Sequence, residues 1–117
     1  MTVAALNGTL AGGAFGMALA CDLRIAVPEA KFFYPVMQLG FLPQPSDPAR
    51  LAALVGPARA KLILMGAQKA GAAEAERIGL IDRMVAPEAL MDEARALVAA
   101  TLGAPPQIAR RIKQMCR

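Results

Sequence analysis

Histidine and tryptophan are absent from this 117-residue sequence, which has one tyrosine and two cysteines. Without an imidazole, every mechanism built on a histidine base or a histidine-containing triad is excluded. Cys21 and Cys116 are far apart and belong to no Cys-x-x-Cys or Cys/His grouping, so we expect no metal site. Any chemistry must therefore come from backbone groups, carboxylates, hydroxyls, lysine or the single tyrosine, Tyr34.

Long apolar runs are also lacking, because Gly, Pro or charge interrupts each one well short of the roughly 20 residues that span a bilayer. Residues 1–10 carry no basic residue ahead of an apolar run, so no secretory signal is supported. We therefore predict a cytoplasmic protein with no membrane partner. The net charge of +4 is concentrated near the C-terminus, and without aromatic residues between the basic ones we predict no nucleic-acid partner.

Hydrophobic residues make up 56% of the chain and charged residues 19%, which predicts one globular unit with a buried core. A short apolar run predicts a strand at 2–6, and further short strands are predicted at 23–27, closed by Pro28-Glu29, and at 81–85. Glycine and proline boundaries predict helices at 12–21, 47–56, 57–66, 72–78, 87–102 and from 106 onward. The alternation of strands and helices indicates an α/β fold.

Residues 31–48 contain four prolines and most of the aromatic residues, which is typical of a structured loop that carries a site. At its end, Asp47 precedes Pro48 in the pattern of a helix N-cap followed by a proline at the first helical position. We interpret Asp22 as a structural carboxylate that pairs with Arg24 or with backbone donors. Cys21 is interpreted as a small buried hydrophobic residue.

Gly12 and Gly13 lie between a predicted strand and a predicted helix, so backbone N–H groups should point outward there with no side chain in the way. Three interpretations stay open: tight strand–helix packing, a phosphate or nucleotide site, and half of an oxyanion hole.

At this point several motifs match one family. They are Ala5-Leu6-Asn7-Gly8, Gly12-Gly13 and Ala18-Leu19-Ala20-Cys21-Asp22-Leu23-Arg24-Ile25, followed by Leu39-Gly40, Arg50-Leu51, Val55-Gly56, Glu74-Ala75 and Gly79-Leu80. Together they resemble the crotonase superfamily, the enoyl-CoA hydratase/isomerase family. The resemblance implies the ββα spiral of that family in partial form. It implies that residues 1–117 correspond to a central to C-terminal-middle segment, without the N-terminal sheet and the last C-terminal helices.

The resemblance also implies an acyl-CoA substrate, with coenzyme A as part of the substrate and no separate cofactor. The thioester oxygen would be bound by two backbone N–H groups, the second of them at Gly13 beside Gly12. The first donor would belong to an upstream loop. A homo-oligomer, a trimer or hexamer, is implied as well.

Hydratases of the family use two glutamates, and this sequence has Gly16 and Val36 at the corresponding positions. Neither residue transfers a proton, so ordinary hydration of enoyl-CoA is not expected. Asp47 or Glu29 could supply a carboxylate, although the Asp47 pattern also fits a helix cap. Tyr34 could donate a proton, or could simply pack. The alternative function is a non-catalytic acyl-CoA-binding or assembly subunit, or an inactive fragment.

Overall fold

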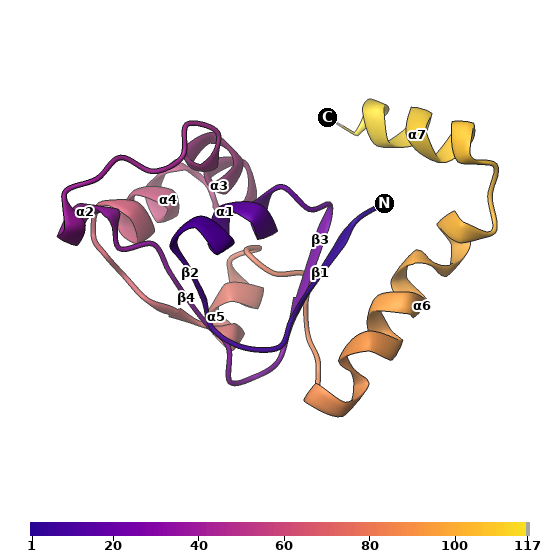
Figure 1. The fold of residues 1–117 in the computed structure, drawn as a ribbon, viewed down its shortest axis with the longest axis horizontal. Helices are drawn as coiled ribbons and strands as arrows, with labels where there is room; N and C mark the ends of the chain where they lie inside the picture. The colour runs from indigo at the N-terminus through magenta and orange to yellow at the C-terminus, as the bar shows by residue number, and fades with distance from the viewer. Residues whose placement is uncertain (117) are drawn as a thin grey trace.

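The computed structural model describes residues 1–116 and shows an α/β fold with two three-stranded sheets (Figure 1). The first sheet is parallel, in the order β1 (Val3–Leu6), β3 (Leu23–Ala26) and β6 (Arg83–Met84). In the second, β2 (Leu10–Ala11) pairs in parallel with β4 (Lys31–Phe33), which pairs antiparallel with β5 (Ala70–Gly71). The chain passes from the first sheet to the second between β1 and β2 and between β3 and β4, and it returns to the first sheet through a helix after β2 and after β5.

The predicted helices are confirmed, with small shifts at their ends. They are α1 (Gly12–Leu19), α3 (Asp47–Val55), α4 (Pro57–Leu64), α5 (Ala72–Arg77), α6 (Leu90–Leu102), which follows a 3-10 turn at Pro87–Ala89, and α7 (Pro106–Met115). The prediction of only three strands was wrong, and residues 31–48 are not all loop, because β4 and the short helix α2 (Val36–Leu39) lie there. Strands of two or three residues are too short for a hydrophobic alternation to reveal them.

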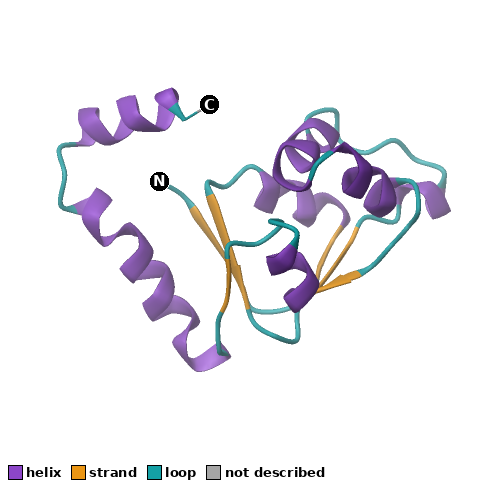
Figure 2. Cartoon of the chain, turned by 180° about the vertical axis from the view of Figure 1, so that it is seen from behind, coloured by secondary structure: helices purple, strands orange, loops and turns teal. Residues whose placement is uncertain are grey.

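Most of the core lies between the two sheets and helices α1, α3, α4 and α5, which Figure 1 and Figure 2 show on one side of β1 and β3, and Leu90 and Ala94 of α6 extend it. Helix α6 lies on the other side of these strands. The rings of Phe15 and Phe32, both fully buried, meet edge to face with centroids 6.3 Å apart. Phe15 therefore anchors α1 against β4, which matters because both elements contribute to the site described below.

Arg24 joins the first sheet to the end of α1 and is only 3% exposed. Its guanidinium donates to the backbone carbonyls of Leu80 and Cys21, at 2.9 and 2.7 Å. The interpretation of Asp22 as a structural carboxylate with backbone donors is confirmed: it accepts from the backbone N–H and the hydroxyl of Thr2 and forms an ion pair with Lys113. Arg24, the other partner considered, pairs instead with Asp82. Cys21 is half-buried rather than buried.

Candidate functional site

The N-terminus of α1 is an open set of backbone donors. Gly12 has a φ of +59°, a conformation that favours glycine, and Ala11 at the N-cap contributes no side-chain hydrogen bond. The first four N–H groups of a helix have no partner within the helix. A Cβ built on Gly12 or Gly13 meets no atom of the described residues within 4 Å. The two glycines predicted to form this turn therefore leave an accessible, positively polarised helix end.

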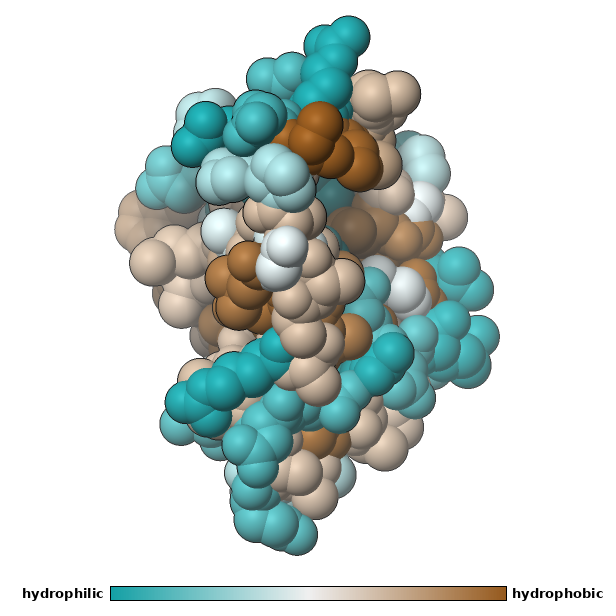
Figure 3. All heavy atoms as spheres, turned by 90° about the vertical axis from the view of Figure 1, so that its right-hand side faces the viewer, coloured by the Kyte–Doolittle hydropathy of each residue, from teal (hydrophilic) through white to brown (hydrophobic). Residues whose placement is uncertain are grey.

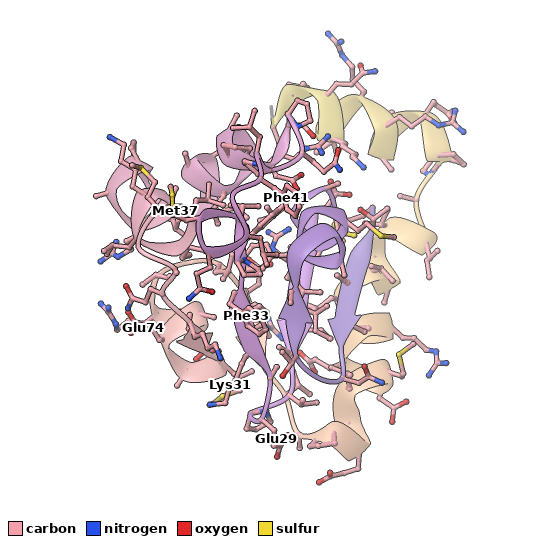
Figure 4. All side chains as sticks on the ribbon, turned by 60° about the vertical axis from the view of Figure 1, so that its left-hand side comes forward. Glu29, Lys31, Phe33, Met37, Phe41 and Glu74 are labelled. Carbon is pink, nitrogen blue, oxygen red and sulfur yellow. The ribbon has the colours of Figure 1, made fainter. Side chains whose placement is uncertain are left out.

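A hollow of about 420 Å³ opens in front of this helix end. It is lined by Gly12, Gly13, Tyr34, Pro35, Val36, Leu39, Phe41, Leu42 and Gln44. Phe41, labelled in Figure 4 together with Met37 of α2, belongs to the segment that follows this helix. Most of the walls are apolar side chains, while the donors come from the glycine turn. This combination suits a ligand with an apolar chain and one oxygen to be bound.

Tyr34 and Asp47 form a hydrogen-bonded pair at this site. The Tyr34 hydroxyl donates to Oδ2 of Asp47 at 2.7 Å and accepts from the backbone N–H of Gln44 at 3.4 Å. Both side chains belong to residues that are only 3% exposed, and the Tyr34 ring packs on Phe15 with centroids 5.7 Å apart. Burial raises the pKa of Tyr34, and the hydrogen bond to Asp47 raises it further. The phenol therefore stays protonated at neutral pH.

The interpretation of Asp47 as the helix cap was wrong. Ser46 occupies the N-cap of α3, Asp47 is its first residue, and no side chain caps this end. The Asp47 carboxylate turns instead into the protein, where the Tyr34 hydroxyl donates to it. A buried hydroxyl is a stronger partner for a carboxylate than helix N–H groups that water can reach.

Gly16 lies directly against this carboxylate. A Cβ added to Gly16 would lie 2.6 Å from Cγ and 2.7 Å from Oδ1 of Asp47, and closer still to Oδ2. A side chain at position 16 and the Asp47 carboxylate therefore exclude each other.

Val36, at the second position where an acid is missing, lines the hollow. Glu29 is exposed, lies well below Phe41 in Figure 4 and is not among the residues that line the hollow, so the fold does not bring it to the site.

The sequence alone indicated Gly12, Gly13, Tyr34 and Asp47, but not their contacts. It missed Phe41 and Leu42 as walls of the hollow, although both are exposed apolar residues, 68% and 92%, in a proline-rich segment. Among the described residues, no group of three or more His, Cys, Asp or Glu residues could hold a metal ion.

A larger hollow of about 610 Å³ lies elsewhere, between α6, α7 and the start of β1 and β3. Figure 3 shows this side, where hydrophobic side chains lie among hydrophilic ones. The Lys113–Asp22 ion pair, 2.9 Å long, belongs to its lining. Neither the glycine turn nor the Tyr34–Asp47 pair reaches it.

Within residues 1–116, none of the helices has the length and apolar character that crossing a membrane requires.

Comparison with known proteins places these features in one family. The model of the enoyl-CoA hydratase/isomerase family matches residues 1–117. A short-chain-enoyl-CoA hydratase of Clostridioides difficile is 43% identical over 97 residues, which cover 83% of this chain and 62% of the relative. A carnitinyl-CoA dehydratase of Citrobacter koseri is 36% identical over 115 residues, covering 98% of this chain and 44% of the relative.

Solved structures of the same family superpose closely on this chain. A hydratase-type protein of Thermobifida fusca, solved in complex with CoA, superposes with a TM-score of 0.92 at 35% identity, covering 97% of this chain and 44% of that one. An enoyl-CoA hydratase of Mycobacterium avium superposes with a TM-score of 0.88 at 31% identity, over 94% of this chain and 49% of that one. The chain thus spans about half the length of these proteins. Its α/β architecture is that of the crotonase fold, and the chain belongs to the enoyl-CoA hydratase/isomerase family of the crotonase superfamily.

Proposed function

We propose that this protein binds acyl-CoA thioesters and stabilises negative charge on the thioester oxygen with the backbone N–H of Gly13. The observation that carries the proposal is the uncapped N-terminus of α1, which opens into a hollow with apolar walls. Preorganised N–H donors of this kind stabilise a developing oxyanion by roughly 3–4 kcal/mol each. The apolar walls would receive the acyl chain, with Gly12 holding the turn that aims the donor.

Membership of the family supports an acyl-CoA ligand, and the structural relative solved with CoA gives it a precedent. The oxyanion role needs a helix end free of competing groups. Helix α1 has no acidic residue in its first turn and no capping side chain. A nucleotide or phosphate would also suit a helix N-terminus, but no lysine or arginine is among the residues that line this hollow.

The proposal is tested by Gly13→Pro with Gly13→Ala as its matched partner, both in the full-length protein. Proline removes the N–H at a first-turn position that tolerates its ring, whereas alanine keeps the N–H and adds a methyl group into open space. We expect the proline variant to turn over acyl-CoA at least about 100-fold more slowly than the alanine variant. Equal rates for the two variants would show that Gly13 is not the donor.

A second candidate function is a non-catalytic acyl-CoA-binding or assembly subunit. The observation in its favour is the absence of acidic side chains at Gly16 and Val36. Acyl-CoA binding measured by calorimetry, without turnover of any acyl-CoA offered, would favour this candidate. The homo-oligomer and the cytoplasmic location stay predictions, and light scattering of the purified protein tests the first.

A further inference from the structure

The Asp47 carboxylate is a buried acidic group that lies next to the site, in contact with Tyr34 and Gly16. It lies against the backbone of Gly16, in the space that a side chain at position 16 would fill. Its partner Tyr34 belongs to the lining of the hollow in front of Gly13, whereas Asp47 does not. A ligand in the hollow would therefore contact Tyr34, and Asp47 would act on it through the Tyr34 hydroxyl, to which it is hydrogen-bonded.

The two oxygens of Asp47 have different environments. Oδ2 accepts from Tyr34, while Oδ1 accepts from no described residue. Oδ2 is thus the oxygen of this carboxylate that is linked to the hollow, through the Tyr34 hydroxyl.

We propose that Tyr34 and Asp47 form a proton relay that removes and returns a proton at the carbon next to the thioester carbonyl. The C–H bond breaks and its proton goes to Oη of Tyr34. The Tyr34 O–H bond breaks at the same time and its proton goes to Oδ2 of Asp47. The electron pair of the C–H bond moves onto the thioester oxygen at the Gly13 N–H, and the reverse transfers complete the cycle. In this relay Tyr34 is the catalytic residue, and Asp47 acts through it as a positioning residue and proton acceptor.

Three features support the relay. The phenol retains its proton at neutral pH, because burial and Asp47 hold the pKa of Tyr34 above its ordinary value of 10.0. Its hydroxyl is oriented by a donor and an acceptor at once, Gln44 and Asp47, so its remaining lone pair is directed rather than free to rotate. Residue 16 is a glycine, and the three atoms nearest to the place of a Cβ there all belong to the Asp47 carboxylate.

The relay rests on the proposed function, since it needs an acyl-CoA bound at Gly13. The test is exchange of the C2 protons of butyryl-CoA in D₂O, followed by NMR in the full-length protein, together with the Kd for butyryl-CoA from calorimetry. No binding by the unaltered protein would refute the proposed function. Binding without C2 exchange above the uncatalysed rate would refute the relay alone.

The variants separate a relay from a structural role. We expect Tyr34→Phe and Asp47→Asn to lower the exchange rate by about 100-fold or more, the usual range for a proton-transfer group, with the Kd changed less than threefold. The control is Asp92→Asn, an exposed carboxylate of α6, which should leave both values unchanged. If Asp47→Asn fails to melt cooperatively, Tyr34→Phe decides, because it keeps the packed ring. A folded variant of either kind that exchanges within threefold of the unaltered rate would overturn the relay.

Discussion

Adding one methyl group at Gly16 should disturb the Tyr34–Asp47 pair without deleting a polar atom. The Cβ of Gly16→Ala would lie 2.6 Å from Cγ of Asp47, well inside van der Waals contact, so the carboxylate must move. Because α1 and α3 are both held by buried side chains, Phe15 and Leu51, the helices have little room to separate. The carboxylate is expected to leave the Tyr34 hydroxyl instead.

The cost follows from three terms. Losing a buried hydrogen bond to a charged group costs about 1.5–3 kcal/mol, and overpacking costs about 1–3 kcal/mol. Alanine in a helix gains about 1 kcal/mol over glycine. The expected net loss in the free energy of unfolding is about 1.5–5 kcal/mol, which for a domain of this size lowers Tm by roughly 6–20 °C. Urea and thermal melts measure both quantities.

Two further variants make the comparison specific. Gly13→Ala, whose Cβ meets no neighbour within 4 Å, controls for a methyl group added to the same helix. In an Asp47→Ala background the methyl at position 16 has no carboxylate to displace, so Gly16→Ala should be neutral or slightly stabilising there. The reasoning is refuted if Gly16→Ala has the same effect in both backgrounds to within about 0.5 kcal/mol.

Two predictions concern titration. Tyr34 is the only tyrosine and tryptophan is absent, so phenolate absorbance reports Tyr34 alone. We expect the Tyr34 phenol to ionise above its ordinary pKa of 10.0, and its pKa to be lower in Asp47→Asn than in the unaltered protein. Because the folded state holds this proton more tightly than the unfolded state, the contribution of Tyr34 to stability is present below pH 10 and is lost as the pH rises through the folded-state pKa. An unchanged midpoint in Asp47→Asn would contradict this. Burial raises the pKa of Asp22, but Lys113 and Thr2 lower it by more, to below its ordinary value of 3.8. The contribution of Asp22 to stability is therefore present above pH 3.8 and is lost as the pH falls through the folded-state pKa. In Lys113→Gln, NMR titration should show a higher pKa for Asp22. An unchanged Asp22 pKa in that variant would contradict the ion pair.

Local patterns in the sequence were enough for most of the fold. Glycine and proline positions marked the ends of nearly every helix, because those residues act on the backbone where they stand. The strand at 23–27 was found because its mostly apolar run, interrupted only by Arg24, ends at Pro28-Glu29. The strands β2, β4 and β5 were not found, because runs of two or three residues exist only through pairing with distant segments.

The sequence by itself determined that no histidine chemistry is available, and that a glycine turn precedes a helix built from small residues. The orientation of Asp47 was decided only by the tertiary structure. Its neighbours in sequence predict a helix cap, whereas Tyr34 and Gly16, which belong to other elements, supply the hydrogen bond and the space that turn the carboxylate inward. Whether the carboxylate caps the helix or turns inward depends on which groups the fold excludes from water, and no local sequence pattern contains that information.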